Sequence, residues 1–199
     1  MSGAFPISSA KFETLGIKSI QNTIISKSVS GKKLARQIDN QRFGFTIRIV
    51  TGTRSDVYGE LMAFIIKQRS GKENFTIIPP EVEDARGTAS GTPHGTASAG
   101  DTSITLGGTG TGTLKAGDMI KFANHSKVYM VVADQSDIST GTLTIEPPLT
   151  TAVSSSDIQY DNVPFTVHLT NDVQEFGVSG ADKDGNLYYE YQFDVEESL

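Results

Sequence analysis

Residues 41–50 read QRFGFTIRIV, and the alternation in this stretch decides the fold class. One face of the segment carries four apolar side chains: Phe43, Phe45, Ile47 and Ile49. The other face carries Thr46 and Arg48. Successive side chains of a β-strand point to opposite faces, so the pattern predicts a half-buried strand. A noisier pattern over residues 19–29 predicts another strand before it.

A helix is predicted directly after this strand. The sequence TGTRSD, residues 51–56, supplies a turn and side chains that cap helices. Apolar side chains then recur at the spacing of one helical face: Tyr58, Leu61, Met62 and Ile65. We therefore expect a helix over residues 56–70, with Gly71 in the left-handed conformation past its end. A short strand over residues 74–78 must stop at residues 79–80, because proline cannot donate to a ladder.

The C-terminal segment, residues 163–199, predicts longer strands. Residues 165–169 alternate, and the final strand has one aromatic and apolar face: Tyr189, Tyr191, Phe193 and Val195. DKDGN at residues 182–186 contains Asp-Gly, which is typical of a hairpin turn. We infer one sheet domain built from residues 1–84 together with residues 163–199, interrupted by an inserted domain.

The middle segment, residues 85–162, has a different composition. Residues 87–112 contain eight Gly and seven Thr, a composition that buries little and predicts linkers and loops. Five short strands are expected within the segment: Ser103–Leu106, Met119–Phe122, Val128–Val132, Gly141–Glu146 and Asp157–Tyr160. Short strands joined by glycine-rich turns predict a small inserted β-barrel or sandwich. The predicted fold class is therefore mainly β with one helix (α+β).

Composition removes several classes of function. The chain of 199 residues has no Cys, which excludes disulfides, thiol nucleophiles and thiolate zinc sites. The three His (His94, His125 and His168) are scattered and leave little for an imidazole metal site. No apolar run approaches the roughly 18 residues of a membrane helix, and residues 1–15 lack the pattern of a signal peptide. We therefore expect a soluble protein with no membrane contact.

Three patterns resemble ligand or catalytic sites, and each has a simpler interpretation. Residues 182–186 resemble the start of a calcium loop, but the position of its bidentate Glu falls at Tyr191, so a hairpin turn is favoured. No Gly-Lys-Ser or Gly-Lys-Thr follows the glycine run at residues 107–112, which favours a loop over a phosphate cradle. No His lies in a nucleophile motif such as Gly-x-Ser-x-Gly. We expect no catalytic residue, cofactor or metal ligand, and no enzymatic activity.

The C-terminal strand carries aromatic and acidic side chains that need an interpretation. Tyr188, Tyr189 and Tyr191 could form a carbohydrate-stacking platform, but tyrosines on a strand more often pack in the core and across strands. Glu196 and Glu197 lie at the end of the chain, and we expect both to be solvated.

The net charge of −6 is unevenly distributed. Residues 1–86 hold 13 Lys and Arg against eight Asp and Glu, a net charge of +5, and residues 87–199 hold four against 15, a net charge of −11. The basic residues are interspersed with acids and lack the aromatic interleaving of single-strand nucleic-acid binders. The imbalance therefore favours a solvated surface or self-association, in which a basic face of one subunit meets an acidic face of the next.

Several segments occur in an order that has a parallel in a known family. They are the strand at residues 43–50, the helix at 56–68, RSG at 69–71, NFTIIPP at 74–80, LKAGD at 114–118, the strands at 127–132 and 143–148, Pro164-Phe165, and YQFDVEESL at 191–199. In this order they resemble the belt domain, and an insertion in it, of phage distal tail and minor tail proteins. Phe64 and Phe75 occupy the aromatic positions of that belt domain.

The resemblance implies a tail-tube-like β-sandwich or split barrel with an inserted small β-barrel. It also implies a structural virion protein that forms a closed, commonly hexameric ring joining the tail tube to the baseplate or tail-tip hub. The partners would be further copies of the chain, the tail tube protein and the hub protein, while DNA would only pass through the lumen. The protein would reside in the phage tail after assembly in the bacterial cytoplasm.

A closed ring needs two different surfaces that meet, and charge complementarity can set their register. Arg36, Arg42 and Arg48 are the candidate interface residues in the basic part of the chain. The alternative function is host recognition by a β-sandwich module of the tail that binds carbohydrate or protein through the inserted domain. The two hypotheses differ in self-association, because a recognition module binds glycans as a monomer or trimer.

Overall fold

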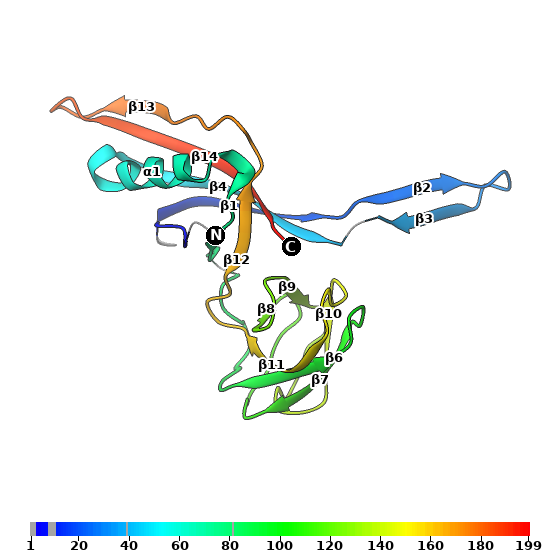
Figure 1. Cartoon of the computed structure of the whole chain (residues 1–199). Helices are drawn as coiled ribbons and strands as arrows, with labels where there is room; N and C mark the ends of the chain where they lie inside the picture. The colour runs from blue at the N-terminus through cyan, green and yellow to red at the C-terminus, as the bar shows by residue number, and fades with distance from the viewer. Residues whose placement is uncertain (1–2, 8–10, 39, 81) are drawn as a thin grey trace.

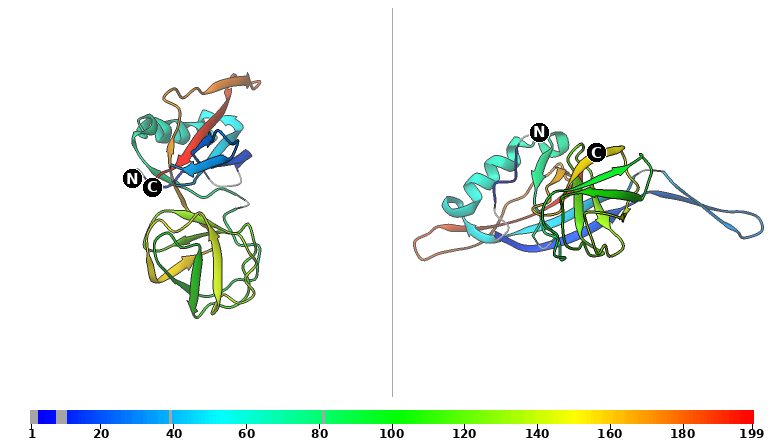
Figure 2. Two further views of the ribbon diagram at one scale, coloured as in Figure 1. Left: turned by 90° about the vertical axis from the view of Figure 1, so that its right-hand side faces the viewer. Right: turned by 90° about the horizontal axis from the view of Figure 1, so that it is seen from below.

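The computed structural model describes residues 3–7, 11–38, 40–80 and 82–199. The strands form a six-stranded antiparallel sheet, a closed six-stranded barrel and a separate two-stranded hairpin (Figure 1). Figure 2 shows the sheet with its helix and the barrel as two adjacent bodies, with the hairpin projecting away from both. The predicted fold class, mainly β with one helix and an inserted small barrel, is confirmed.

The sheet combines strands from both ends of the sequence. Its order is β1 (Phe12–Ile20), β4 (Arg42–Thr53), β14 (Leu187–Glu197), β12 (Phe165–Leu169) and β5 (Phe75–Ile77), with β13 (Gly177–Ala181) paired to β14 off this path. The two longest strands are central neighbours, and Ile47 of β4 lies opposite Phe193 of β14. The predicted alternation of β4 is confirmed, since its four apolar side chains are all buried.

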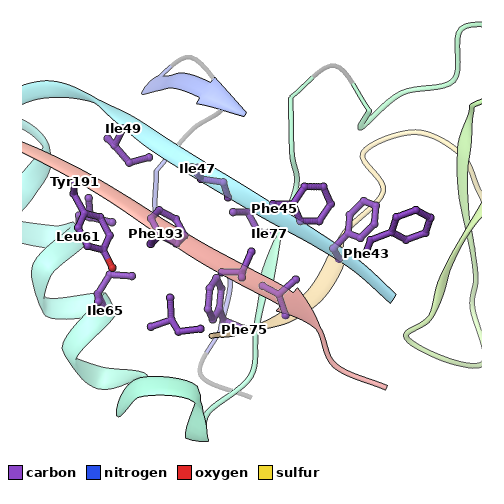
Figure 3. Close-up of a cluster of buried hydrophobic side chains, with 14 of the residues drawn as sticks. Phe43, Phe45, Ile47, Ile49, Leu61, Ile65, Phe75, Ile77, Tyr191 and Phe193 are labelled. Atoms are coloured by element: carbon purple, nitrogen blue, oxygen red, sulfur yellow. The ribbon is translucent and has the colours of Figure 1, made fainter. Parts of the chain in front are cut away.

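The apolar face of the sheet forms the first hydrophobic core (Figure 3). β4 contributes the four residues of its apolar face, and the neighbouring strands contribute Tyr191, Phe193, Val195, Phe165, Val167, Leu169, Phe75 and Ile77. Ring contacts such as Phe45 with Phe165, 4.9 Å between centroids, join residues more than a hundred positions apart. Burial of these large side chains, at about 1.5–3 kcal/mol each, is what holds the terminal segments together.

The helix covers part of this apolar face. A π-helical turn, Arg54–Tyr58, leads into α1 (Gly59–Lys67). Tyr58, Leu61 and Ile65 are buried against the sheet, as their spacing predicts, and Figure 3 places Leu61 and Ile65 beside Tyr191. No helix in the described part of the chain is long and apolar enough to span a membrane.

The end of the helix differs from the prediction at Gly71. The left-handed residues are Arg69 (φ 54°) and Ser70 (φ 60°), so the expectation of a left-handed Gly71 is wrong. Gly71 lies instead in a short 3-10 turn, Ser70–Lys72, that packs on β12. A Cβ atom at Gly71 would lie 2.6 Å from the carbonyl oxygen of Leu169. The glycine is therefore required by close approach to a neighbouring strand.

The barrel has its own core. Its closed order is β10 (Thr142–Glu146), β7 (Ser103–Gly108), β6 (Pro93–Ala97), β11 (Val153–Gln159), β8 (Met119–Phe122) and β9 (Val128–Val131). The five strands predicted in this segment are all present. Fourteen buried residues form its core: Ile104, Leu106, Leu114, Ile120, Phe122, Tyr129, Val131, Ile138, Leu143, Ile145, Leu149, Val153, Ile158 and Tyr160.

The glycine- and threonine-rich run is part of this barrel. Apart from the strand predicted at Ser103–Leu106, which is part of β7, residues 87–112 are predicted to form linkers and loops; this is wrong, because they also contain β6 and a bridge between Ser90 and Thr111. Gly95 of β6 explains the composition, since a Cβ atom there would lie 2.5 Å from the Phe122 ring. Glycine lets the backbone approach a large core side chain, so the barrel closes with few apolar residues in this strand.

The two connections between sheet and barrel pair with each other. The amide of Val163 donates to the carbonyl of Glu83 (3.0 Å), and that of Ala85 donates to the carbonyl of Tyr160 (3.0 Å). The chain therefore enters and leaves the barrel at one place, which is the geometry that an inserted folding unit requires. The division at residues 84 and 163 into two folding units stays a prediction.

Substitution of Gly71 tests the close approach to β12. Gly71→Ala should lower the free energy of unfolding by about 1–3 kcal/mol, because the added methyl group must displace the Leu169 backbone. Gly180→Ala is the matched control, since the space around Gly180 is open, and its effect should stay within about 0.5 kcal/mol. Urea denaturation followed by circular dichroism measures both; equal midpoints for the two variants would contradict the packing argument.

The paired connections predict that the barrel folds alone. A fragment of residues 82–163 should give a strand-type circular dichroism spectrum and a cooperative thermal transition, because its core and both connecting segments are intact. A dispersed amide spectrum by nuclear magnetic resonance is the more stringent measurement. A disordered fragment would show that contacts with the sheet are needed to fold the barrel.

Candidate functional site

A buried ion pair joins the barrel to the sheet. Lys127 directly precedes β9, Glu197 ends β14, and Lys127 Nζ lies 2.5 Å from Glu197 Oε2. The side chains are 2% and 0% exposed. The Glu197 carboxylate also accepts the backbone N–H of Phe43 (3.2 Å) and of Val128 (2.8 Å). One carboxylate is therefore bound to β4 of the sheet and β9 of the barrel at once.

The prediction that Glu197 is solvated is wrong. Glu197 lies on the inward face of β14, two residues beyond Val195, and continues the alternation of buried positions there. The alternation of the strand places Glu197 on the same face as Val195 and so indicates its burial. The last apolar residue in this alternation is Val195, and for this reason the sequence alone suggested a solvated Glu197. Glu196 points to the other face and is only partly buried. The prediction that tyrosines of the final strand pack in the core is confirmed for Tyr191, which is buried.

Apolar groups surround the ion pair and exclude water. Met119 and Val128 of the barrel belong to the core of the sheet. Lys127 Nζ lies 4.8 Å from the centroid of the Phe43 ring, a cation–π contact. Burial lowers the pKa of Lys127, while the adjacent Glu197 opposes the shift. A charge pair with this enclosure resists displacement of either element, so it holds the barrel in a defined position on the sheet.

The outward face of the sheet is covered with ion pairs. Arg42 lies 2.7 Å from Glu196, Lys18 2.6 Å from Asp194, and Arg48 3.0 Å from Glu13 and 2.9 Å from Glu190. Partial burial raises the pKa of Asp194, but hydrogen bonds from Lys18 and Thr46 outweigh this and keep the pKa below its ordinary value. Both signs of charge therefore meet on this face within one chain.

The structure separates the three predicted interface arginines. Arg42 and Arg48 share the outward face of β4, where each pairs with a carboxylate of β14. Arg36 lies on β3 (Lys33–Gln37) of the separate hairpin and is exposed. Only Arg36 thus lies on a projecting element. The role of the three arginines in an interface stays a prediction.

The separate hairpin, called the arm below, comprises residues 23–37 and contains β2 (Thr23–Lys27) and β3. In the described part of the chain these strands pair only with each other, and all their residues are exposed. The strand predicted over residues 19–29 is in fact divided, because β1 ends at Ile20 where the chain leaves the sheet. The exposed fractions of Ile24, Ile25 and Leu34 exceed one half. Two-stranded hairpins are marginally stable in water, so the arm has the character of an assembly element.

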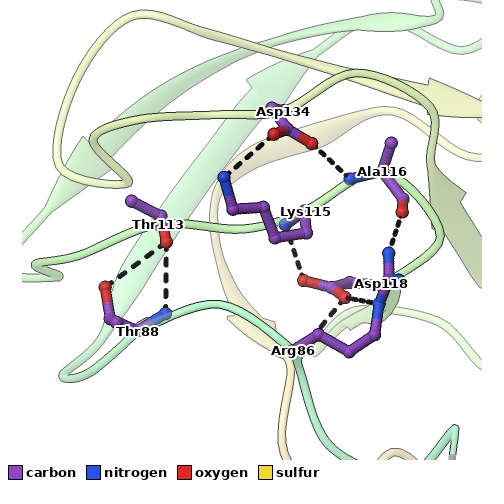
Figure 4. A network of polar contacts seen from close by, with 7 residues as sticks. All are labelled: Arg86, Thr88, Thr113, Lys115, Ala116, Asp118 and Asp134. Atoms are coloured by element: carbon purple, nitrogen blue, oxygen red, sulfur yellow. Dashed lines mark hydrogen bonds and ion pairs between the residues drawn. The ribbon is translucent and has the colours of Figure 1, made fainter.

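Polar contacts inside the barrel hold its entrance loop (Figure 4). Asp118 is buried and accepts the backbone N–H of Arg86 (3.1 Å) and of Lys115 (2.7 Å). Asp134 accepts the backbone N–H of Ala116 (2.9 Å), and that hydrogen bond is the first cause that lowers its pKa. The predicted turn in LKAGD is confirmed, and the carboxylates of Asp118 and Asp134 both accept backbone N–H groups of this turn.

The remaining candidate chemical groups have structural partners. His94 lies 2.7 Å from Asp157, His125 2.8 Å from the Tyr129 hydroxyl, and His168 2.8 Å from the Ser198 hydroxyl, at three separate places. Asp182 accepts the backbone N–H of Asp184 and Asn186, which confirms the hairpin turn at residues 182–186. Among the residues described, no group of three or more His, Cys, Asp or Glu is arranged to hold a metal ion.

Comparison with known proteins gives one family match. Residues 82–163 match the family model described as distal tail protein pb9, B domain. The matched range is the barrel with its two connecting segments, so this unit is similar to that domain. No curated protein matches the chain.

The match confirms the resemblance to the phage distal tail family. The chain therefore contains a domain similar to one of a distal tail protein, which indicates a structural role in a bacteriophage tail. The virion as its location and other tail proteins as its partners follow from that role.

A double-mutant cycle tests the buried ion pair. Glu197→Leu should destabilise the protein by about 3–5 kcal/mol, because Lys127 is left buried without its partner. Lys127→Met in the same chain should recover part of this loss, since the unpaired buried charge is removed while the amides of Phe43 and Val128 still lack the acceptor that Glu197 provides. Lys18→Met removes a half-exposed pair and is the control, expected at about 1 kcal/mol or less. Chemical denaturation measures all variants; additive losses in the cycle would contradict the coupling.

Proposed function

We propose that the protein is a non-enzymatic structural subunit of the phage tail that forms a closed ring, commonly of six copies, between the tail tube and the baseplate or tail-tip hub. Its partners would be copies of itself, the tail tube protein and the hub protein. Assembly would take place in the cytoplasm of the bacterial host. DNA would only pass through the lumen, and the net charge of −6 disfavours its retention.

The arm is the observation that carries this proposal. Its exposed isoleucines and leucine lie on a hairpin without support from the rest of the described chain. A strand pair of this kind gains stability when a neighbouring molecule covers it. A contact between the arm of one copy and a different surface of its neighbour joins two unlike surfaces. Repeated contacts between unlike surfaces generate rings when the rotation closes.

The firmly held barrel supports the same role. The ion pair between Lys127 and Glu197 is buried on the side of the sheet that faces the barrel, while the arm projects from another side (Figure 1). A subunit of this shape can place its sheet in a ring and carry its barrel at a constant position relative to that ring. The barrel would then be available to neighbouring tail proteins.

The mass of the purified protein in solution tests the ring. Light scattering across a concentration range, with negative-stain imaging of each peak, should give a discrete oligomer near six subunits with a central hole. A chain in which residues 23–37 are replaced by a short Gly-Ser turn should remain monomeric, because the unlike surface is lost.

Two results would contradict the ring. The first is a monomer at every concentration, and the second is a ring that forms equally well without the arm. Monomers or trimers that bind glycans would instead support the alternative of host recognition by the tail. The folded state of the arm-deleted chain is checked by its thermal transition.

A further inference from the structure

A second hairpin projects from the opposite end of the sheet to the arm. It comprises β13 and the adjoining part of β14, and Figures 1 and 2 both place its turn on the far side of the molecule from the arm. We define it by residues 172–188 and refer to it as the acidic hairpin. β13 pairs with β14 along one edge and has no strand on its other edge in the described chain. Val178 and Leu187 are 54% and 45% exposed.

The arm carries an unusual excess of positive charge. Residues 23–37 contain four basic residues and no acid: Lys27, Lys32, Lys33 and Arg36. Lys27 lies directly opposite Lys33 in the hairpin register. Like charges at directly opposed positions destabilise a strand pair. This feature is explained if acidic groups from outside the hairpin neutralise the two lysines.

The acidic hairpin carries the complementary charge. Its residues include four acids and one base: Asp172, Glu175, Asp182, Asp184 and Lys183. Hydrogen bonds from Asn186 are the first cause that lowers the pKa of Asp182, which keeps that carboxylate ionised. Asp184 forms an ion pair with Lys183 (3.2 Å), and its side chain is 65% exposed. The acidic hairpin also carries the exposed apolar residues Val178 and Leu187. In the same way, the arm carries exposed apolar residues as well as its lysines: Ile24, Ile25 and Leu34.

We propose that the arm of one copy lies against the acidic hairpin of the next copy in the ring, an inference that rests on the proposed ring. The two elements project from opposite ends of one sheet, which is the arrangement that a head-to-tail contact between copies requires. Lysines of the arm meet carboxylates of the hairpin, and the exposed aliphatic groups of the two elements cover each other. The charges set register and partner choice, while apolar burial supplies affinity.

Charge reversal on each element tests the contact. Lys27→Glu with Lys33→Glu reverses the charge at the two opposed lysines and brings the net charge of the arm from +4 to zero. Glu175→Lys with Asp184→Lys changes the net charge of the acidic hairpin from −3 to +1 without removing the Asp182 hydrogen bonds. At low salt each reversed chain should need at least about tenfold more protein to assemble, and a chain with both reversals should assemble within about threefold of the unmodified chain. Lys67→Glu, on an exposed position of α1, is the matched control and should change nothing.

The outcomes separate this inference from the proposed ring. Rings that form unchanged from both reversed chains overturn the contact and leave the ring standing. Loss of assembly that the combined reversals do not restore also overturns the pairing. An arm-reversed chain that keeps its ring and loses affinity for duplex DNA assigns the arm to nucleic acid and overturns the inference. An unmodified chain that never forms a closed oligomer overturns the proposed function and this contact together.

A crosslinking measurement covers the case in which a reversed chain fails to fold. The natural sequence has no Cys, so Ser30→Cys in the turn of the arm and Ser179→Cys in β13 introduce a unique pair. Treatment of the assembled ring with a flexible bismaleimide should give a covalent ladder that ends in a closed species. Each single-Cys chain should give dimers at most. A ring that yields no ladder from the double variant overturns the proposed contact.

Discussion

The buried pair of Lys127 and Glu197 is the interaction on which the arrangement of the two bodies depends. It brings the turn between β8 and β9 of the barrel against the end of β14 in the sheet. The Glu197 carboxylate also accepts backbone N–H groups of β4 and β9. Removal of two charges from water is costly, and full hydrogen bonding is what makes such a pair tolerable. The geometry of the ion pair therefore fixes one position of the barrel on the sheet.

The two faces of the sheet have different roles: the inner face forms the hydrophobic core, and the outer face carries ion pairs. The inner face is built from large alternating side chains and holds the helix, the strands of both termini and part of the barrel. The outer face pairs its charges within the chain, as between Arg42 and Glu196. Charges that are already paired at short range contribute little to recognition of a neighbour. The projecting arm and acidic hairpin, whose charges lie at the ends of the sheet, are consequently better suited to assembly than the central arginines.

Sequence patterns predicted the elements well where one period dominates. The strand at residues 42–53, the helical face of Tyr58, Leu61 and Ile65 and the Asp-Gly hairpin all follow from local spacing. The patterns failed where a residue's role depends on a distant neighbour. Gly71 is glycine because of the Leu169 carbonyl, and Gly95 because of the Phe122 ring. The resemblance to distal tail proteins was likewise available from the order of segments, and the match over residues 82–163 confirms it.

The sequence by itself determined the fold class, the presence of an insertion and the excess of basic residues in the first 86 positions, because these depend on composition and on periods of a few residues. The tertiary structure alone decided that Glu197 is buried, that Arg42 and Arg48 are paired within the chain, and that the lysines of the arm stand apart. The physical reason is that burial and electrostatic pairing are set by distances between segments far apart in sequence, which no local pattern encodes.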